Sequence, residues 1–540
     1  MRYFLIAIAA LTLTACGERP PAYEVEEKSI AQLQADMTSG AVTSEQLVQA
    51  YLDRIERIDR SGPNLNSVLA LNPDALEQAR ALDAERAAGR VRGPLHGIPI
   101  LLKDNIESAD PMPTTAGSLA LADNVTNRDA PLVARLREAG AVILGKTNLS
   151  EWANIRSSHS TSGWSAVGGL TRNPYALDRN ACGSSSGSGA AAAASLAAIT
   201  IGTETDGSIT CPSAINGLVG IKPTVGLVSR THVVPISHSQ DTAGPMGRSV
   251  ADVAAVLSVI AGSDPADAAT TEADAHRADY VAALDANALQ GRRIGVVRFM
   301  AGFHPPVDAL FEQAIAEMRE AGAEIVEITE RPASMSGLGG DELTILLAEL
   351  RSDLNAYLAT TPQAVRTRTL ADVIAFNGQT PAETALFGQD LFEQAQATQG
   401  VEDPAYRTAH GRAAAAARAA IDTMMREHRV DALAAPSLGA AWTTDIVNGD
   451  HYIGGGASQL PAVSGYPHIT VPMGQVGGLP VGLSLIAEAW SEAKLLAFAY
   501  AYEQRAQART PPRYLPTLSN EDAFATALRP APRATSAPQP

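Results

Sequence analysis

Residues 181–210 read ACGSSSGSGAAAAASLAAITIGTETDGSIT, and this stretch decides the fold class. A Gly/Ser cluster usually indicates a flexible linker, but an alanine-rich helical segment follows it at once, which predicts that the cluster forms a helix amino terminus. The helix leads into an apolar strand at 198–202, and Ser208 follows the end of that strand after Gly207, which permits a tight turn. A serine just past a strand end in an α/β sheet is a candidate nucleophile.

A second strand ends in a lysine. In the segment PLHGIPILLKDN (94–105), the apolar run predicts a strand that is covered on both faces, and Lys103 stands at its carboxyl end. Lysine is rare in this chain, because arginine supplies all but five of the 41 basic residues. A desolvated lysine can lose its proton whereas an arginine cannot, so Lys103 is the best-placed candidate for a general base.

The remaining chain alternates helices with buried strands, which predicts an α/β fold with a central parallel or mixed sheet. An amphipathic helix at 43–58 begins with capping-box spacing between Thr43 and Gln46. The periodicity predicts further helices at 129–139 and 307–320, and further strands at 142–144, 294–297, 324–328, 469–471 and 483–486. Between 341 and 427 nearly every segment has a helical pattern, which predicts a helical insert or cap.

The amino terminus has the pattern of an export signal. Arg2 precedes an apolar run at 3–13 that is too short to span a bilayer, and LTAC (13–16) resembles the lipobox of bacterial lipoproteins. We therefore expect a signal peptide at 1–15, a lipid anchor on Cys16, a tether at 16–28 and a periplasmic or cell-envelope location. A plain secretory signal with an incidental cysteine is the alternative. The last twelve residues, RPAPRATSAPQP, are rich in Pro and Ala and predict disorder.

Charge and cysteine content narrow the possible partners. A formal charge of −17, without a run of basic residues, argues against binding to nucleic acid. Without Cys16, the chain retains Cys182 and Cys211, which have neither zinc-ligand spacing nor the number that a disulfide framework needs. We interpret them as two small buried residues, although an exported protein would permit a bond between them.

One motif competes with Ser208 for the role of nucleophile. GSSSG (183–187) formally matches the G-x-S-x-G elbow of α/β hydrolases, with Ser185 at its centre. An elbow requires a buried strand directly before it, and the preceding NPYALDRNAC is polar and irregular, so we reject this interpretation. The sequence also contains no P-loop, no H-E-x-x-H and no dinucleotide-binding fingerprint.

Several long motifs together resemble the amidase signature family. They are GPLHGIPILLKDNI, TTAGS, GAVILGKTNLSEWA, GSSSGSGAAAAA, GTETDGSITCPSAINGLVGIKPT and SQDTAGPMGRSVAD, and they occur in the family's order and near its spacing. The resemblance implies a single large domain with the family's central mixed sheet surrounded by helices, at about 29–515, with the helical insert at about 341–427 and a tail at 516–540. The three serines, the TETDGS loop and the insert look closest to bacterial peptide amidases, which remove the C-terminal carboxamide of peptides.

The resemblance also implies the roles of individual residues. Lys103 matches the family's base, Ser184 the bridging serine that follows a cis peptide, and Ser208 the nucleophile. The backbone amides of Thr205, Asp206, Gly207 and Ser208 match the oxyanion hole. A supporting hydrogen bond is expected from Ser185. Asp104 and Asn105 are turn formers at the end of the lysine strand, and we expect them to orient it through turn hydrogen bonds. No metal or organic cofactor is implied.

Two departures from the common family pattern lie beside the nucleophile. Asp206 stands where many members have glycine, which puts a carboxylate near the oxyanion hole, and Thr210 stands where many have arginine. Neither departure changes Lys103, Ser184 or Ser208, which match the family's Ser-Ser-Lys triad.

Three classes of function stay open. The first is an amidohydrolase acting on a linear carboxamide, such as a peptide C-terminus. The second is a family member acting on aryl or fatty acyl amides or on esters. The third is a non-enzymatic surface lipoprotein that retains only the fold. The export signal and the acidic charge disfavour the family's glutaminyl-tRNA amidotransferase subunit.

Some other polar and aromatic residues have two open interpretations. Lys146 and Lys222 lie in motifs typical of scaffold positions. His159 and His238 are bystanders or substrate contacts. The remaining four residues either line a pocket under the helical insert or belong to the core: Tyr357, Phe376, Asn377 and Trp442.

Overall fold

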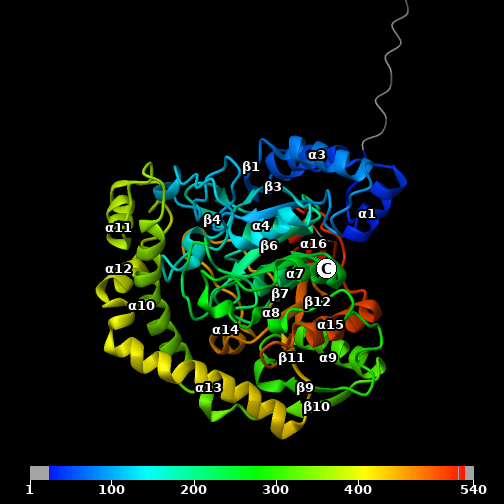
Figure 1. The fold of residues 1–540 in the computed structure, drawn as a ribbon. Coiled ribbons are helices and arrows are strands. Elements are labelled where there is room, and N and C mark those ends of the chain that lie inside the picture. The colour runs from blue at the N-terminus through cyan, green and yellow to red at the C-terminus, as the bar shows by residue number, and fades with distance from the viewer. Residues whose placement is uncertain (1–22, 521, 530–540) are drawn as a thin grey trace, which may run out of the picture.

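The computed structural model describes residues 23–520 and 522–529, and within them one large mixed sheet organises the fold (Figure 1). The spatial order of its eleven described strands is β1-β3-β2-β6-β8-β7-β12-β13-β11-β9-β10. Their bounds are β1 Val68–Leu71, β2 Pro99–Lys103, β3 Val142–Thr147, β6 Ile199–Glu204, β7 Val219–Lys222, β8 Thr242–Gly247, β9 Arg293–Val297, β10 Glu324–Ile328, β11 Ala432–Pro436, β12 His468–Val476 and β13 Leu479–Ile486. A small second sheet pairs β4 Trp164–Ser165 with β5 Gly169–Leu170.

Helices surround the sheet, as expected. Those that precede the insert are α1 Ile30–Ser39, α2 Ser44–Arg54, α3 Ala75–Ala87, α4 Pro131–Glu138, α5 Ser186–Ala193, α6 Thr210–Ile215, α7 Val250–Ile260, α8 Ala273–His276 and α9 Pro305–Glu320. The others are α10 Leu338–Ala359, α11 Leu370–Gln379, α12 Asp390–Ala397, α13 Pro404–His428, α14 Gln459–Ser464, α15 Glu492–Ala506 and α16 Asp522–Ala527. Figure 1 shows α10 to α13 along one side and the lower edge of the molecule.

β2 and β6, the two strands that the sequence predicts beside the site, are neighbours in the sheet. β2 pairs in parallel with β6, with Leu102 opposite Ile201. Because parallel strands end at the same edge of a sheet, Lys103 at the end of β2 and the loop after Glu204 of β6 lie at one edge. β6 then pairs antiparallel with β8, so the sheet is mixed.

The alanine-rich segment folds as the buried helix α5. All eight residues of α5 are buried, and the helix packs against β2, β3 and β6. A Cβ atom on Gly187 would collide with the backbone carbonyl oxygens of Ser67 and Asn148, so the close approach at this turn requires glycine. The small side chains let α5 lie directly on the sheet, which fixes the serine cluster at the helix start above the strand ends.

Two expectations about local structure need correction. The helix that begins with the Thr43 capping box ends at Arg54, and π-helical backbone continues from Ile55 to Arg60. The end of the expected tether packs on the fold: Val25 is 2% exposed and the Glu27 N–H donates to Ser195 Oγ at 3.1 Å. The predicted tether therefore extends too far into the chain, because the segment at 23–28 has its own hydrogen bonds and a buried apolar side chain.

The predicted signal peptide, Cys16 and most of the Pro-rich tail lie outside the described residues. Within the described part of the chain, no helix has both the length and the apolar character needed to cross a bilayer.

Candidate active site

Lys103 is completely buried at the end of β2 and points at oxygen atoms. Its Nζ lies 2.7 Å from Ser184 Oγ, 2.8 Å from Thr203 Oγ1 and 3.2 Å from the Thr203 carbonyl oxygen. Burial lowers the pKa of Lys103 to about 7, although the charges of Asp241 and Glu204 act in the opposite direction. A substantial fraction of this amine is therefore neutral near pH 7.

Ser184 and Ser208 come from two segments that are joined at the site. The Gly183–Ser184 peptide is cis, and the Ser184 side chain is buried. The N–H of the next residue, Ser185, donates to the Ser208 carbonyl oxygen at 3.2 Å. Ser208 is 7% exposed, and its hydroxyl makes no hydrogen bond to any other described residue. Lys103 is therefore hydrogen-bonded to Ser184. The segment of Ser208 is held next to Ser184, but the two serine hydroxyls are not hydrogen-bonded to each other.

The loop 205–208 presents backbone N–H groups without acceptors. Among the described residues, none accepts a hydrogen bond from the amides of Asp206, Gly207 or Ser208. Gly207 has a φ of +77°, which glycine adopts without strain, and this turns the backbone at the loop. Unpaired backbone donors at one turn can stabilise an oxyanion that develops next to them.

Glu204 and Asp241 fix the two ends of this loop. Glu204 Oε2 accepts hydrogen bonds from the N–H groups of Ile209 and Thr210 at 2.7 and 2.9 Å. Thr205 Oγ1 donates to Asp241 Oδ1 at 2.6 Å. Burial raises the pKa of Asp241 to about 6, and its hydrogen bonds oppose this rise.

The three supporting residues predicted from the sequence also form hydrogen bonds at the site. Ser185 Oγ donates to the Thr203 carbonyl oxygen at 3.0 Å, and Asn105 Nδ2 donates to Thr203 Oγ1 at 2.9 Å. Asp104 Oδ2 accepts from the Thr115 N–H at 3.1 Å. Thr203 is therefore the shared partner of Lys103, Asn105 and Ser185.

Sequence reasoning missed Thr203 as a functional residue. Its position on β6, beside the strand that ends in Lys103, was the signal that could have identified it. Gln240 and Asp241 were also missed, although both lie in the quoted motif SQDTAGPMGRSVAD. Glu342 of α10, which accepts from Gln240 Nε2 at 3.0 Å, gives no sequence signal, because its insert helix is more than 100 residues away in the chain.

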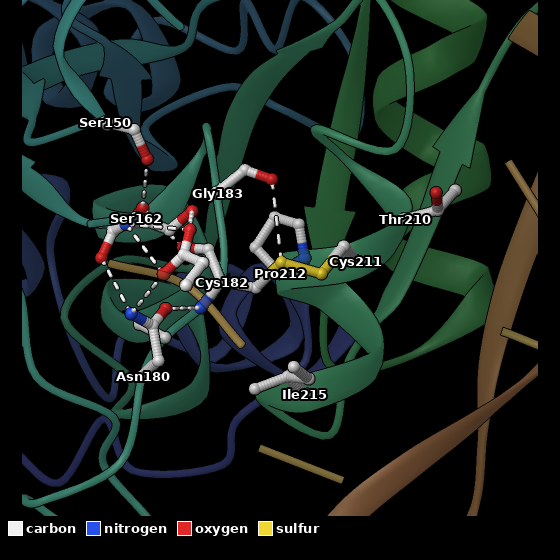
Figure 2. Close-up of a disulfide and its surroundings, with 12 residues drawn as sticks. Ser150, Ser162, Asn180, Cys182, Gly183, Thr210, Cys211, Pro212 and Ile215 are labelled. Carbon is white, nitrogen blue, oxygen red and sulfur yellow. Dashed lines mark hydrogen bonds between the residues drawn. A yellow bond between two sulfur atoms is a disulfide. The ribbon is translucent and has the colours of Figure 1, made fainter. Parts of the chain in front are cut away.

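The interpretation of Cys182 and Cys211 as separate buried residues is wrong. They form a disulfide with their Cα atoms 6.1 Å apart (Figure 2). Cys182 lies two residues before Ser184, and Cys211 lies three residues after Ser208, in the first turn of α6. The two thiols meet because the fold brings the two serine segments together, which a separation of 29 residues does not reveal. The disulfide ties the segments to each other beside the site.

A cavity of about 270 Å³ opens next to these serine segments. Gly183, Gly207 and the disulfide are among the groups that line it. Trp442 lines the pocket, and its indole N–H donates to Asp450 Oδ1 at 3.2 Å. The other lining residues are Asn154, Ser162, Asp206, Thr210, Ser437, Leu438, Asp450, Tyr452, Gly455, Gly456 and Ser458.

The other candidates lie away from this cavity. The Tyr357 hydroxyl donates to Glu107 Oε1 at 2.8 Å within a second apolar cluster, where Phe376 also packs. Asn377 is fully buried and donates to Gln389 Oε1 at 3.1 Å. Lys222 Nζ donates to the Pro223 carbonyl oxygen at 3.0 Å, which is a structural contact.

One group of potential metal ligands occurs in the described part of the chain: His238, Glu349 and Asp353, whose ligand atoms lie within 4.8 Å of one another. These atoms already have partners. His238 Nδ1 lies 2.9 Å from Asp353 Oδ2, and Tyr406 donates to Glu349 Oε1 at 2.8 Å. The cluster holds the loop at 237–239 on α10 and is separate from the cavity.

Comparison with known proteins identifies the family. The family model described as Amidase matches residues 46–496. The chain belongs to the amidase family. A protein of Arabidopsis thaliana described as a probable amidase is 39% identical over 503 residues, which cover 91% of this chain and 93% of the relative.

Solved amidase structures give a closer match. The crystal structure of native peptide amidase from Stenotrophomonas maltophilia is 53% identical, with a TM-score of 0.85, and the match covers 91% of this chain and 99% of that one. A peptide amidase in complex with the competitive inhibitor chymostatin is 54% identical, with a TM-score of 0.87, over 90% of this chain and 99% of that one. This amidase is therefore a hydrolase of carbon–nitrogen bonds with the amidase signature fold, close to peptide amidases.

Proposed function

We propose that this amidase removes the C-terminal carboxamide of peptides through a Ser-Ser-Lys triad. The observation that carries the proposal is the buried, partly neutral Lys103 at 2.7 Å from Ser184 Oγ. The similarity to peptide amidases supports the choice of substrate class.

The proton relay begins at the neutral lysine. A neutral amine has two N–H groups and one lone pair, and the Nζ of Lys103 contacts three oxygen positions. The two positions on Thr203 take the N–H groups, which leaves the lone pair to accept the proton of Ser184. Ser184 then accepts the proton of Ser208, whose oxygen attacks the amide carbonyl carbon. General-base assistance of this kind contributes about 10²–10⁴ to the rate.

The tetrahedral intermediate and the leaving group are handled by the same site. The developing negative oxygen accepts hydrogen bonds from the free amides of the loop 205–208, each worth about 10²–10³ in rate. The proton held by Lys103 returns through Ser184 to the leaving nitrogen, and ammonia departs. Water then hydrolyses the ester between Ser208 and the acyl group, with the relay again removing the proton, and the free acid is released.

The decisive experiment compares substrate classes and a base variant. Purified protein is incubated with peptide amides, aryl amides and esters, and the release of ammonia, amine or alcohol is measured. We expect the highest kcat/KM for peptide amides and a large loss in Lys103→Arg, because arginine stays protonated. Lys494→Arg, the same change at a surface ion pair with Glu488, serves as the control.

Two outcomes separate the alternatives. Faster turnover of aryl amides or esters would assign another substrate class, and no turnover of any compound would favour a non-enzymatic lipoprotein. If Lys103→Arg kept full activity, the proposed base would be wrong.

We further propose that the protein is exported and anchored by lipid on Cys16, on the basis of the LTAC motif alone. Several acyl chains on one cysteine give stable anchoring, since each buried methylene adds about 0.8 kcal/mol. Metabolic labelling with a fatty acid analogue tests this. Label should enter the native protein and not Cys16→Ser, and an unlabelled native protein in the soluble fraction would indicate a plain secretory signal.

A further inference from the structure

Asp206 places an acidic side chain in the wall of the cavity, two residues before the proposed nucleophile. It shares this wall with Gly207, whose backbone N–H belongs to the proposed oxyanion hole. Ser208 directly follows Gly207 in the chain, so a substrate that fills this cavity lies next to the proposed nucleophile.

The Asp206 carboxyl group has one oxygen without a partner. Oδ1 is buried and makes no hydrogen bond to any described residue. The same carboxyl group interacts with the side chains of Ser458 and Glu342. Asp206 itself lines the cavity, so its carboxyl group lies where a bound substrate can supply a hydrogen-bond donor.

Glu342 makes this position acidic. Its two oxygens accept from Gln240 Nε2 and Gln459 Nε2, each at 3.0 Å, and the residue is 5% exposed. In the part of the chain that the structure describes, no lysine or arginine forms an ion pair with either Asp206 or Glu342. Burial and the negative charge of Glu342 raise the pKa of Asp206 well above its usual range, and burial also raises the pKa of Glu342.

This arrangement distinguishes the two possible ends of a peptide. The nitrogen of a primary carboxamide carries two N–H donors, whereas an ionised carboxylate offers acceptors only. One oxygen of either group can lie in the oxyanion hole. Discrimination therefore depends on the protein group that contacts the second atom, which is the nitrogen of the carboxamide or the other oxygen of the carboxylate.

Building on the proposed function, we propose that the Asp206–Glu342 pair selects a C-terminal carboxamide over a free C-terminal carboxylate. The Asp206 carboxyl group accepts a hydrogen bond from the carboxamide N–H of the substrate. The negative charge of the pair repels the carboxylate of an unamidated peptide, which includes the product of the reaction. The pair therefore sets specificity for the amide and weakens inhibition by the product.

Binding to an inactive enzyme tests the proposal without turnover. In Ser208→Ala protein, isothermal titration measures the Kd of an N-acetyl dipeptide amide and of the same dipeptide as the free acid. We expect the amide to bind at least about tenfold more tightly, because like charges in contact disfavour the acid. Adding Asp206→Asn and Glu342→Gln together removes the charge, and the ratio of the two Kd values should fall to about three or less. An unchanged ratio would overturn the proposal.

Two further variants serve as controls for this measurement. Asp341→Asn removes the acidic residue next to Glu342 on α10, which pairs with Arg412 at the surface, and should leave the ratio as in the parent. If the combined variant does not fold, Ser208→Ala with Glu342→Gln alone should still lower the ratio at least threefold, and failure to do so would count against the pair. Ammonia release by the enzyme with Ser208 intact is measured separately. If the protein with Ser208 intact releases ammonia but the Kd ratio does not change in the charge variants, only the role of the pair is rejected. If the Kd ratio depends on the charge but the protein with Ser208 intact releases no ammonia, only the proposed function is rejected.

Discussion

Lys103 and Lys146 are both completely buried on neighbouring parallel strands, yet their surroundings differ. Lys146 Nζ donates to the Ile106 carbonyl oxygen at 2.6 Å and to Thr114 Oγ1 at 2.8 Å, and it lies 3.9 Å from the Asp104 carboxylate. Lys103 faces hydroxyl and carbonyl oxygens and has no carboxylate within ion-pair distance among the described residues. Burial lowers the pKa of both, but Asp104 favours the charged form of Lys146. Burial alone therefore does not make a lysine a base, and the partner decides its role.

Replacing Lys103 should have the largest effect on activity of the variants that test this difference between the two lysines. Lys103→Arg should lower kcat/KM for a peptide amide by about 10²–10⁴, because the relay loses its proton acceptor. Steady-state kinetics measure the loss, and circular dichroism confirms that the variant is folded. A folded variant with a loss of less than threefold would contradict the role of Lys103.

Loss of the disulfide should have the next largest effect, this time on stability. Cys182→Ala with Cys211→Ala should lower the free energy of unfolding by about 2–4 kcal/mol, because the unfolded chain is no longer closed into a loop. Denaturant unfolding of the double variant measures this. The disulfide joins the segments that carry Ser184 and Ser208, and it does not join the segments that contact Lys146. We therefore expect kcat/KM to fall as well. Unchanged activity would show that the disulfide only stabilises the fold.

The converse experiment changes the structural lysine. Lys146→Met should lower the free energy of unfolding by about 1–3 kcal/mol, because two buried acceptors lose their donor. Activity per folded molecule should change far less than in Lys103→Arg. A catalytic loss as large as that of Lys103→Arg, in folded Lys146→Met, would remove the distinction between the two lysines.

The same comparison shows what the sequence could and could not predict. The apolar runs that end at Lys103 and before Thr205 identify buried strands, and parallel pairing puts their ends at one edge. The contact between Lys103 and Ser184 was expected only through the family resemblance, since 81 residues separate them. Local patterns carry no information on which distant segments meet, and the partnership of Cys182 with Cys211 and the position of Glu342 beside Asp206 were missed for that reason.

Replacing Thr203, a hydrogen-bond partner of Lys103, should have the smallest effect, a shift in the pH dependence of kcat/KM. Thr203→Val removes Oγ1, which accepts from the Lys103 amine and favours its charged form. The pKa of Lys103 should then fall further, so the acid limb of kcat/KM against pH should move below its native position, by about one unit or less. A shift to higher pH would contradict this account of the lysine environment.

Titration of Lys103 itself tests the central claim most directly. The chain has only five lysines, so NMR of protein labelled at the lysine ε-carbon gives few signals, and Lys103→Arg assigns one by its loss. We predict that this signal titrates near pH 7, because burial lowers the pKa of Lys103 to about 7, while Lys222 titrates near 8. A Lys103 signal that stays charged until about pH 10, the ordinary range for lysine, would contradict the account.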